Sequence, residues 1–102
     1  MKVSTLTPGT PVQAGYRNWF THCEFVGFEL THNGARYETF KALKTETGCR
    51  NLSELEALAD SQDNSSVYAT FRDTEDGVTW SAYLWQGRWR VGTSADVLQL
   101  AA

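Results

Sequence analysis

The sequence has few cysteines and no long apolar run, and each shortage excludes a class of protein. Its 102 residues include two cysteines, too few for a disulfide scaffold, so we expect reduced thiols. No apolar run reaches the roughly 20 residues that a transmembrane helix needs. The N-terminal segment also lacks the apolar stretch of a signal peptide. These features predict a cytoplasmic protein that does not insert into membranes.

Basic residues are not in excess either. Nine Lys and Arg residues stand against twelve Asp and Glu residues, giving a net charge of −3 at pH 7. Residues 46–76 are the most acidic part, with eight acidic and two basic residues, whereas both flanking segments are slightly positive. A general DNA-binding protein would instead be expected to carry a basic face.

Motifs of catalysis and metal binding are missing as well. The chain has no glycine-rich phosphate loop and no nucleophile elbow. His22, Cys23, His32 and Cys49 are the candidate ligands, but none of them are paired at zinc-ligand spacing. Adjacent residues such as His22 and Cys23 point to opposite faces of a strand. Nothing in the sequence around either cysteine indicates an activated thiol. We therefore expect no catalytic residue, no metal and no cofactor, and we interpret the protein as non-enzymatic.

Length and composition indicate one folded domain over residues 1–102. A chain of about 100 residues buries about 60 to 70% of its unfolded surface, which suffices for one core. Hydrophobic residues make up 41% and charged residues 21% of the chain, which is ordinary for a globular domain. Aromatic residues are plentiful at 13%, with four Trp, and large rings supply much of a small core.

The first half of the chain predicts a β-hairpin. A short strand is expected from Val12, and residues 23–30 alternate between apolar and polar or small side chains, as a strand does. Asn33-Gly34 is a strong hairpin signal, and residues 37–43 are expected to form the returning strand. The structure of residues 16–20 is left open.

The register of this hairpin depends on its loop length. A two-residue turn at Asn33-Gly34 would place Glu29 opposite Glu38, and like charges in that position are destabilising. A three-residue loop with Gly34 in a left-handed conformation avoids this clash, so we favour the longer loop.

One helix and three further strands are predicted after this hairpin. Residues 52–61 place apolar side chains on one helical face, and either Asn51 or Ser53 is suited to be the N-cap. Strands are expected over residues 67–72, 78–85 and 88–91, with turns at Asp76-Gly77 and Gln86-Gly87. Residues 94–100 fit either a short strand or a turn of helix. The predicted fold is therefore α+β, with about five or six strands in antiparallel hairpins, in the order β-β-β-α-β-β-β, and one short helix packed on the sheet.

Two-residue turns at both positions would divide the last three strands into two faces. They pair Phe71 with Ala82 and Leu84 with Trp89, and side chains alternate along each strand. One face is apolar and is expected to be core: Val67, Ala69, Phe71, Trp80, Ala82, Leu84, Trp89 and Val91. The other mixes rings with arginines: Tyr68, Thr70, Arg72, Ser81, Tyr83, Trp85, Arg88 and Arg90.

The second face has two interpretations. In the first, which is the commoner outcome for rings on a sheet, Trp19, Phe20 or the first hairpin covers it and the arginine stems pack over the rings. In the second it is a binding surface, because Tyr, Trp and Arg are enriched in interface hot spots. The candidate partner-binding residues are Tyr68, Arg72, Tyr83, Trp85, Arg88 and Arg90.

The acidic middle of the chain supplies a second candidate surface. An acidic surface can occupy a basic nucleic-acid channel on a partner, since it offers the charge that phosphates would. Its residues are Glu54, Glu56, Asp60, Asp63, Asp73, Glu75 and Asp76.

The expected function is that of a small interaction protein that binds a partner protein, as a monomer or a homodimer. Small size, mild acidity and the lack of an active-site signature are typical of inhibitors that phages and mobile elements direct against host defence machinery. One alternative is a nucleic-acid-binding module that uses the aromatic and arginine face. Another is a small-molecule-binding protein or enzyme with a pocket near His22, Cys23 or Cys49.

Overall fold

The structure is a computed structural model that describes residues 2–17, 19–31, 34–62, 65–92 and 96–101. Within these residues it contains eight strands and two α-helices, together with one short 3₁₀ helix, η1 (Val3–Thr5). The helices are α1 (Phe40–Thr47) and α2 (Leu52–Asp60). The strands are β1 (Pro11–Tyr16), β2 (Trp19–Leu30), β3 (Ala35–Tyr37), β4 (Val67–Asp73), β5 (Thr79–Trp85), β6 (Arg88–Val91), β7 (Asp96–Val97) and β8 (Gln99–Ala101).

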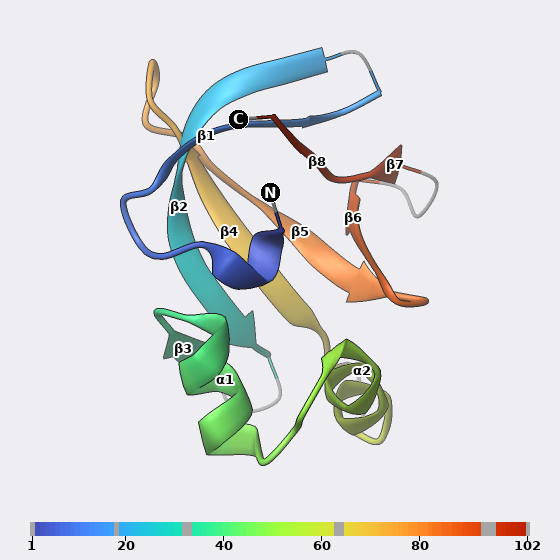
Figure 1. Ribbon diagram of the computed structural model, residues 1–102. Coiled ribbons are helices and arrows are strands. Elements are labelled where there is room, and N and C mark those ends of the chain that lie inside the picture. The colour runs from blue at the N-terminus through green and yellow to red at the C-terminus, as the bar shows by residue number, and fades with distance from the viewer. Residues whose placement is uncertain (1, 18, 32–33, 63–64, 93–95, 102) are drawn as a thin grey trace.

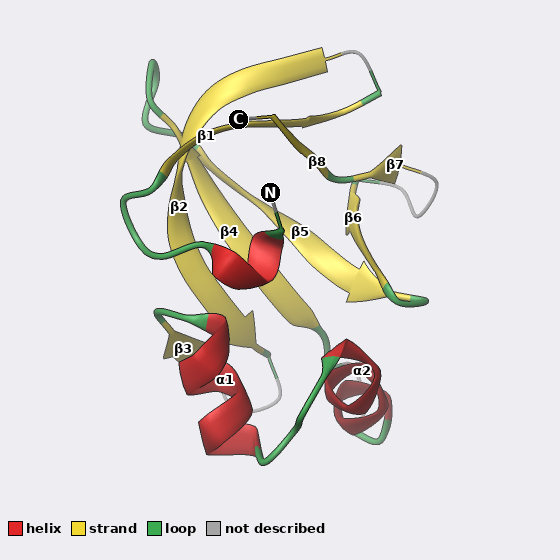
Figure 2. Ribbon diagram, in the orientation of Figure 1, coloured by secondary structure: helices red, strands yellow, loops and turns green. Residues whose placement is uncertain are grey.

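The strands form one antiparallel sheet that curls into a nearly closed barrel (Figure 1). Their order is β7-β6-β5-β4-β2-β1-β8, and β3 pairs with the end of β2. Both α-helices lie at the same end of the barrel, and the β1–β2 hairpin lies at the other (Figure 2). The predicted α+β class and antiparallel sheet are confirmed, but there are more strands than the five or six expected and two helices in place of one.

The predicted strand over residues 37–43 is wrong, because β3 ends at Tyr37 and α1 begins at Phe40. The side chain of Thr39 caps the helix by accepting a hydrogen bond from the Ala42 N–H at 3.1 Å. Gly48, in the left-handed conformation, ends the helix after Thr47.

Helical spacing in α1 directs two large apolar side chains to the same side. Phe40 and Leu43 stand three residues apart and are both buried. A strand would have pointed them to opposite faces, with one of them exposed to water. Burial of both side chains therefore favours the helix. The segment is too short for its apolar pattern to distinguish a helix from a strand.

The β2–β3 hairpin has a longer loop than either predicted register. Leu30 pairs with Ala35 and Glu29 pairs with Arg36, so the two-residue and three-residue loops are both wrong. Asn33 lies outside the described residues. Opposite charges face each other across the hairpin, which avoids the repulsion that a two-residue turn would cause.

Helix α2 is confirmed with nearly its predicted bounds. Asn51 is the N-cap, since its side chain accepts a hydrogen bond from the Glu54 N–H at 3.0 Å. Leu55 and Ala59 are buried in the core, and Leu52 and Leu58 pack partly against it. The apolar face read from the sequence is therefore the face that meets the sheet.

The last strands confirm the two faces but not every pairing. Leu84 pairs with Trp89 as predicted, whereas Phe71 pairs with Trp80 instead of Ala82. The two-residue turn at Asp76-Gly77 is therefore wrong, because residues 74–77 all belong to the loop. A shift of two residues leaves each side chain on its predicted face. Of residues 94–100, Asp96 and Val97 form β7, and Gln99 and Leu100 belong to β8.

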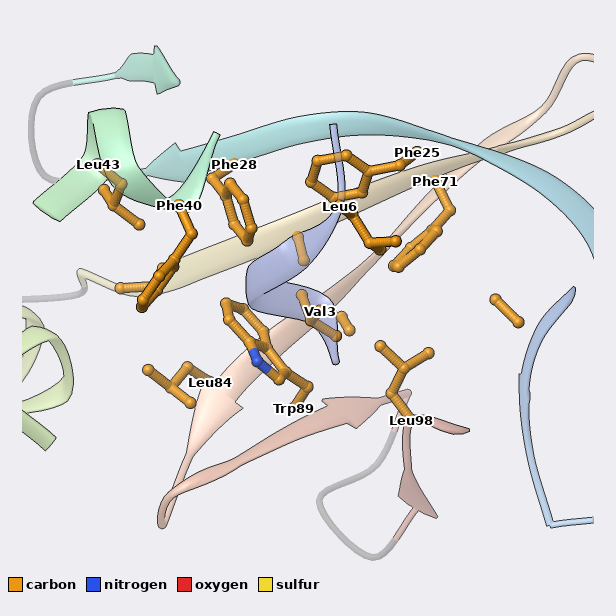
Figure 3. Close-up of a cluster of buried hydrophobic side chains, with 14 of the residues drawn as sticks. Val3, Leu6, Phe25, Phe28, Phe40, Leu43, Phe71, Leu84, Trp89 and Leu98 are labelled. Carbon is orange, nitrogen blue, oxygen red and sulfur yellow. The ribbon is translucent and has the colours of Figure 1, made fainter. Parts of the chain in front are cut away.

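The barrel interior is filled by rings from several elements (Figure 3). Phe25 lies 5.0 Å from Phe28 and 5.6 Å from Phe71 between ring centroids, in edge-on arrangements. Trp89 lies 5.9 Å from Phe28, which joins the C-terminal strands to β2. This packing makes the sheet a rigid support for its outward side chains.

Among the described residues, neither α1 nor α2 has the length and the apolar character that a membrane-spanning helix needs.

Candidate binding face

The mixed face of the last strands lies on the outside of the barrel, and we call its eight residues the outer face: Tyr68, Thr70, Arg72, Ser81, Tyr83, Trp85, Arg88 and Arg90. Arg72, Trp85 and Arg88 are exposed, and the other members are half-buried. The opposite face is buried or half-buried core, as predicted. Trp19 and Phe20 do not cover the outer face, because they begin β2 at the far end of the sheet and are themselves exposed (Figure 1).

Two tyrosines form the centre of the outer face. Tyr68 on β4 pairs directly with Tyr83 on β5, so their side chains are neighbours on the same surface. Glu29 continues this row on one side and Arg90 on the other. The row therefore presents two half-buried rings between an acidic and a basic side chain.

Trp85 and Arg90 form the most specific contact of the outer face. The Trp85 side chain is 40% exposed, although it stands on a sheet. The guanidinium carbon of Arg90 lies 5.1 Å from the centre of the Trp85 ring, and Arg90 Nε donates a hydrogen bond to the Trp85 carbonyl at 3.1 Å. A cation in this position is attracted to the ring and restricts its motion. Arg88 pairs with Trp85 across the hairpin and is exposed, so a second cationic side chain stands on the same face as the ring.

Glu56 on α2 fixes the turn that carries this contact. Its carboxylate accepts hydrogen bonds from the N–H groups of Gln86 and Gly87, the latter at 2.8 Å. Gln86 has φ of 52°, a left-handed conformation that costs energy for a residue with a side chain. The helix thus stabilises the β5–β6 turn beside Trp85 and Arg88. No local pattern predicts this contact, because 30 residues separate Glu56 from Gln86.

A shallow groove of about 340 Å³ adjoins the outer face. Its lining is Val26, Gly27, Phe28, Glu29, Arg36, Tyr37, Glu38, Thr70, Arg72 and Thr79. The groove lies where a β-bulge between Phe25 and Gly27 interrupts the pairing of β2 with β4. A glycine inside a predicted strand is the signal that could have predicted this bulge.

The groove is lined by two acidic and two basic side chains, Glu29, Glu38, Arg36 and Arg72. Arg72 forms an ion pair with Glu24 at 2.8 Å, and both side chains are substantially exposed, so the pair adds little to stability. The hydroxyls of Thr70 and Ser81 are hydrogen-bonded to each other at 2.8 Å. Glutamates and arginines are both present, so the groove offers donors and acceptors without a strong net charge.

The acidic candidate residues do not form one surface. Those of α2 lie at the helical end of the barrel, and those of the β4–β5 turn lie at the opposite end (Figure 1). Within α2, Glu54 supports the N-cap and Glu56 the β5–β6 turn, Asp60 is exposed, and Asp63 lies outside the described residues. In the turn, Asp73 and Asp76 accept hydrogen bonds from the N–H groups of Glu75 and Val78 at 2.8 Å.

The cysteine and histidine candidates are dispersed. Cys23 is buried, and burial raises the pKa of its thiol, which is the opposite of what a nucleophilic cysteine needs. Cys49 is half-buried beyond the end of α1, and His32 lies outside the described residues. Nowhere in the described ranges do three His, Cys, Asp or Glu side chains gather as metal ligands would.

A second hollow adjoins Cys23 and His22, near the position proposed for a small-molecule pocket. It measures about 430 Å³ and is lined by Pro11, Val12, Gln13, His22, Cys23 and Thr74. Its lining includes one histidine and no carboxylate side chain. The hollow therefore contains no paired acid and base.

Comparisons with family models, with curated proteins and with solved structures found no match.

Proposed function

We propose that this protein is a non-enzymatic interaction protein whose outer face binds a partner protein. The observation that carries this proposal is the exposed Trp85 ring, held by Arg90 and flanked by Arg88 on a sheet with a packed core. Trp, Tyr and Arg dominate interface hot spots because they bury large areas and donate hydrogen bonds. A ring that is already restricted loses little conformational entropy on binding.

The charge pattern favours a protein partner over a nucleic acid. Arg72 is paired with Glu24, and Glu29 stands beside Tyr68 in the central row. Acidic side chains therefore interrupt the outer face, and the net charge of the chain is −3. A nucleic-acid surface needs a continuous positive potential for the phosphates, whereas mixed charges around aromatic residues are typical of protein interfaces.

We further propose that binding blocks the partner. A small domain can act by occupying a surface that its partner needs, and this is how a phage or mobile-element inhibitor of host defence machinery would act. The size and composition of the chain support this reading. In this proposal the protein acts in the cytoplasm, where its target would be.

Affinity capture from a lysate of the native host tests the proposal. The bait is the wild-type protein, the double variant Trp85→Ala/Arg88→Ala, or the matched control Val78→Ala/Lys41→Ala. The control also removes one exposed apolar and one exposed basic side chain, but away from the outer face. We expect wild type and control to capture the same protein. The double variant should capture it at least about tenfold less, since loss of a hot spot costs roughly 1.4 kcal/mol or more.

Equal capture by the double variant, with circular dichroism showing an intact fold, would contradict the proposal. A titration of Trp fluorescence with a single-stranded oligonucleotide separates the nucleic-acid alternative. We expect no quenching at low salt. Quenching that falls steeply with salt, and that the double variant lacks, would identify nucleic acid as the partner instead.

A further inference from the structure

Strand β2 extends beyond the strand that pairs with it. Its residues 19–22 pair with β1 on one side. On the other side β4 ends at Asp73, which pairs with Cys23, and the chain then turns away. No strand in the described part of the chain pairs with residues 19–21 on that side. A strand edge of this kind is a template for pairing with another chain.

The backbone groups of Phe20 point toward this unpaired side. The Phe25 N–H donates to the Thr10 carbonyl, on the β1 side, and the His22 carbonyl accepts from the Thr74 N–H, on the β4 side. Successive residues alternate in direction along a strand. Phe20 is two residues from His22, so its N–H and C=O both face the edge that β4 leaves open.

Exposed apolar side chains flank the same edge. Trp19 is 56% exposed and Phe20 is 38% exposed, and they stand on opposite faces of the strand. The Trp19 ring lies 5.8 Å from the Tyr16 ring, so it is partly supported by β1. Neither a lysine nor a proline blocks the edge, although natural proteins commonly use these residues to prevent strand addition.

The charges beside the edge are acidic. Asp73 ends β4, and Glu75 and Asp76 lie in the turn that follows, with no basic residue among residues 73–78. This segment touches the edge directly, because the Thr21 hydroxyl donates to Asp73 Oδ2 at 2.7 Å and the Thr74 hydroxyl donates to the His22 carbonyl at 3.1 Å. The nearby cation Arg17 is paired with Asp96 at 2.9 Å. A strand added to this edge would therefore pass beside three carboxylates.

We propose that residues 19–22 of β2 bind an extended, basic segment of a partner protein by strand addition. Phe20 supplies the backbone hydrogen bonds, and the Trp19 and Phe20 side chains cover apolar residues of the added strand. The carboxylates of the β4–β5 turn attract its lysines or arginines. This site lies at the opposite end of the barrel from the Trp85 hairpin (Figure 1) and does not depend on the outer face.

Nuclear magnetic resonance titration tests the proposal with a defined probe. The probe is a capped peptide of roughly seven alternating lysine and valine residues, about the length of a strand. It is added at millimolar concentration to the isotopically labelled protein. We expect the amide resonances of Phe20 and His22 to shift and saturate. A peptide with glutamate in place of lysine should shift them at least about tenfold less at equal concentration, because it repels the acidic turn.

Two variants locate the binding. Phe20→Lys keeps the backbone N–H but adds a charge that repels the basic peptide, so the shifts should be lost. Ala42→Lys adds the same charge on the exposed side of α1, at the far end of the barrel, and should keep them. Both folds are checked by the remaining resonances.

Three results would overturn the proposal. The first is the absence of shifts at Phe20 and His22, or their persistence in Phe20→Lys. The second is equal binding of the glutamate peptide, which would show that the edge does not select a basic segment. The third is a concentration-dependent dimer in light scattering that Phe20→Lys abolishes, because the edge would then pair with a second copy of this chain.

Discussion

At the residue scale, hydrogen bonds to one carboxylate control how the β4–β5 turn responds to pH. The Thr21 hydroxyl and the Glu75 N–H both donate to Asp73, and together they lower the pKa of its carboxyl below the ordinary value of 3.8. A carboxyl whose pKa is lower in the folded state stabilises the fold at any pH above its unfolded-state pKa. This stabilisation is lost as the pH falls through the folded-state pKa. Asp73 thus contributes fully at neutral pH and loses its effect only in strong acid.

Thr21→Val removes the first donor while keeping the side-chain shape. We expect the pKa of Asp73 to rise toward its ordinary value, since the hydroxyl that favoured the carboxylate is gone. Acid unfolding should consequently begin at a higher pH. A carboxyl titration by nuclear magnetic resonance measures the first effect and circular dichroism the second. Thr45→Val, whose hydroxyl bonds only within α1, should leave Asp73 unchanged; an unchanged pKa in Thr21→Val would contradict the assignment.

At the element scale, α2 and the β5–β6 turn are coupled through Glu56. Its carboxylate accepts hydrogen bonds from the N–H groups of Gln86 and Gly87. Helix and turn therefore hold each other in place, although they lie far apart in the sequence. The position of Trp85 depends on this contact, because Gln86 follows it directly.

Glu56→Ala should loosen the turn without unfolding the barrel. A hydrogen bond to a charged group contributes about 1.5 kcal/mol, so amide hydrogen exchange at Gln86 and Gly87 should accelerate by roughly tenfold. Asp60→Asn, on the same helix, serves as the control and should leave both exchange rates as they are. Unchanged exchange in Glu56→Ala would show that the turn is held by other contacts.

Elements with a clear periodic pattern were the ones the sequence predicted well. Helix α2 has apolar residues at helical spacing and a capping asparagine, and β6 follows a recognisable two-residue turn. Helix α1 was missed because Phe40 and Leu43 fit a strand and a helix equally well over so short a segment. The turn between β4 and β5 was misjudged because Asp76-Gly77 suits a two-residue turn, whereas the chain uses a longer one.

At the scale of the whole molecule, the barrel could not be read from the sequence. Its closure depends on β1 pairing with β8, which joins Gln13 to Ala101 across almost the whole chain. Pairings of that kind leave no local pattern. The residues of the outer face were predictable because alternation along a strand survives a shift of two residues. The groove at Gly27 and the separation of the acidic residues required the three-dimensional structure.

The central claim is that the outer face contacts a partner protein through Trp85 and the central tyrosines. Oxidative side-chain footprinting, read by mass spectrometry on the free protein and on the captured complex, tests it most directly. The account predicts that Trp85, Tyr83 and Tyr68 are oxidised more slowly in the complex, whatever happens at Trp19. Equal oxidation of these three residues in the free and bound protein would contradict it.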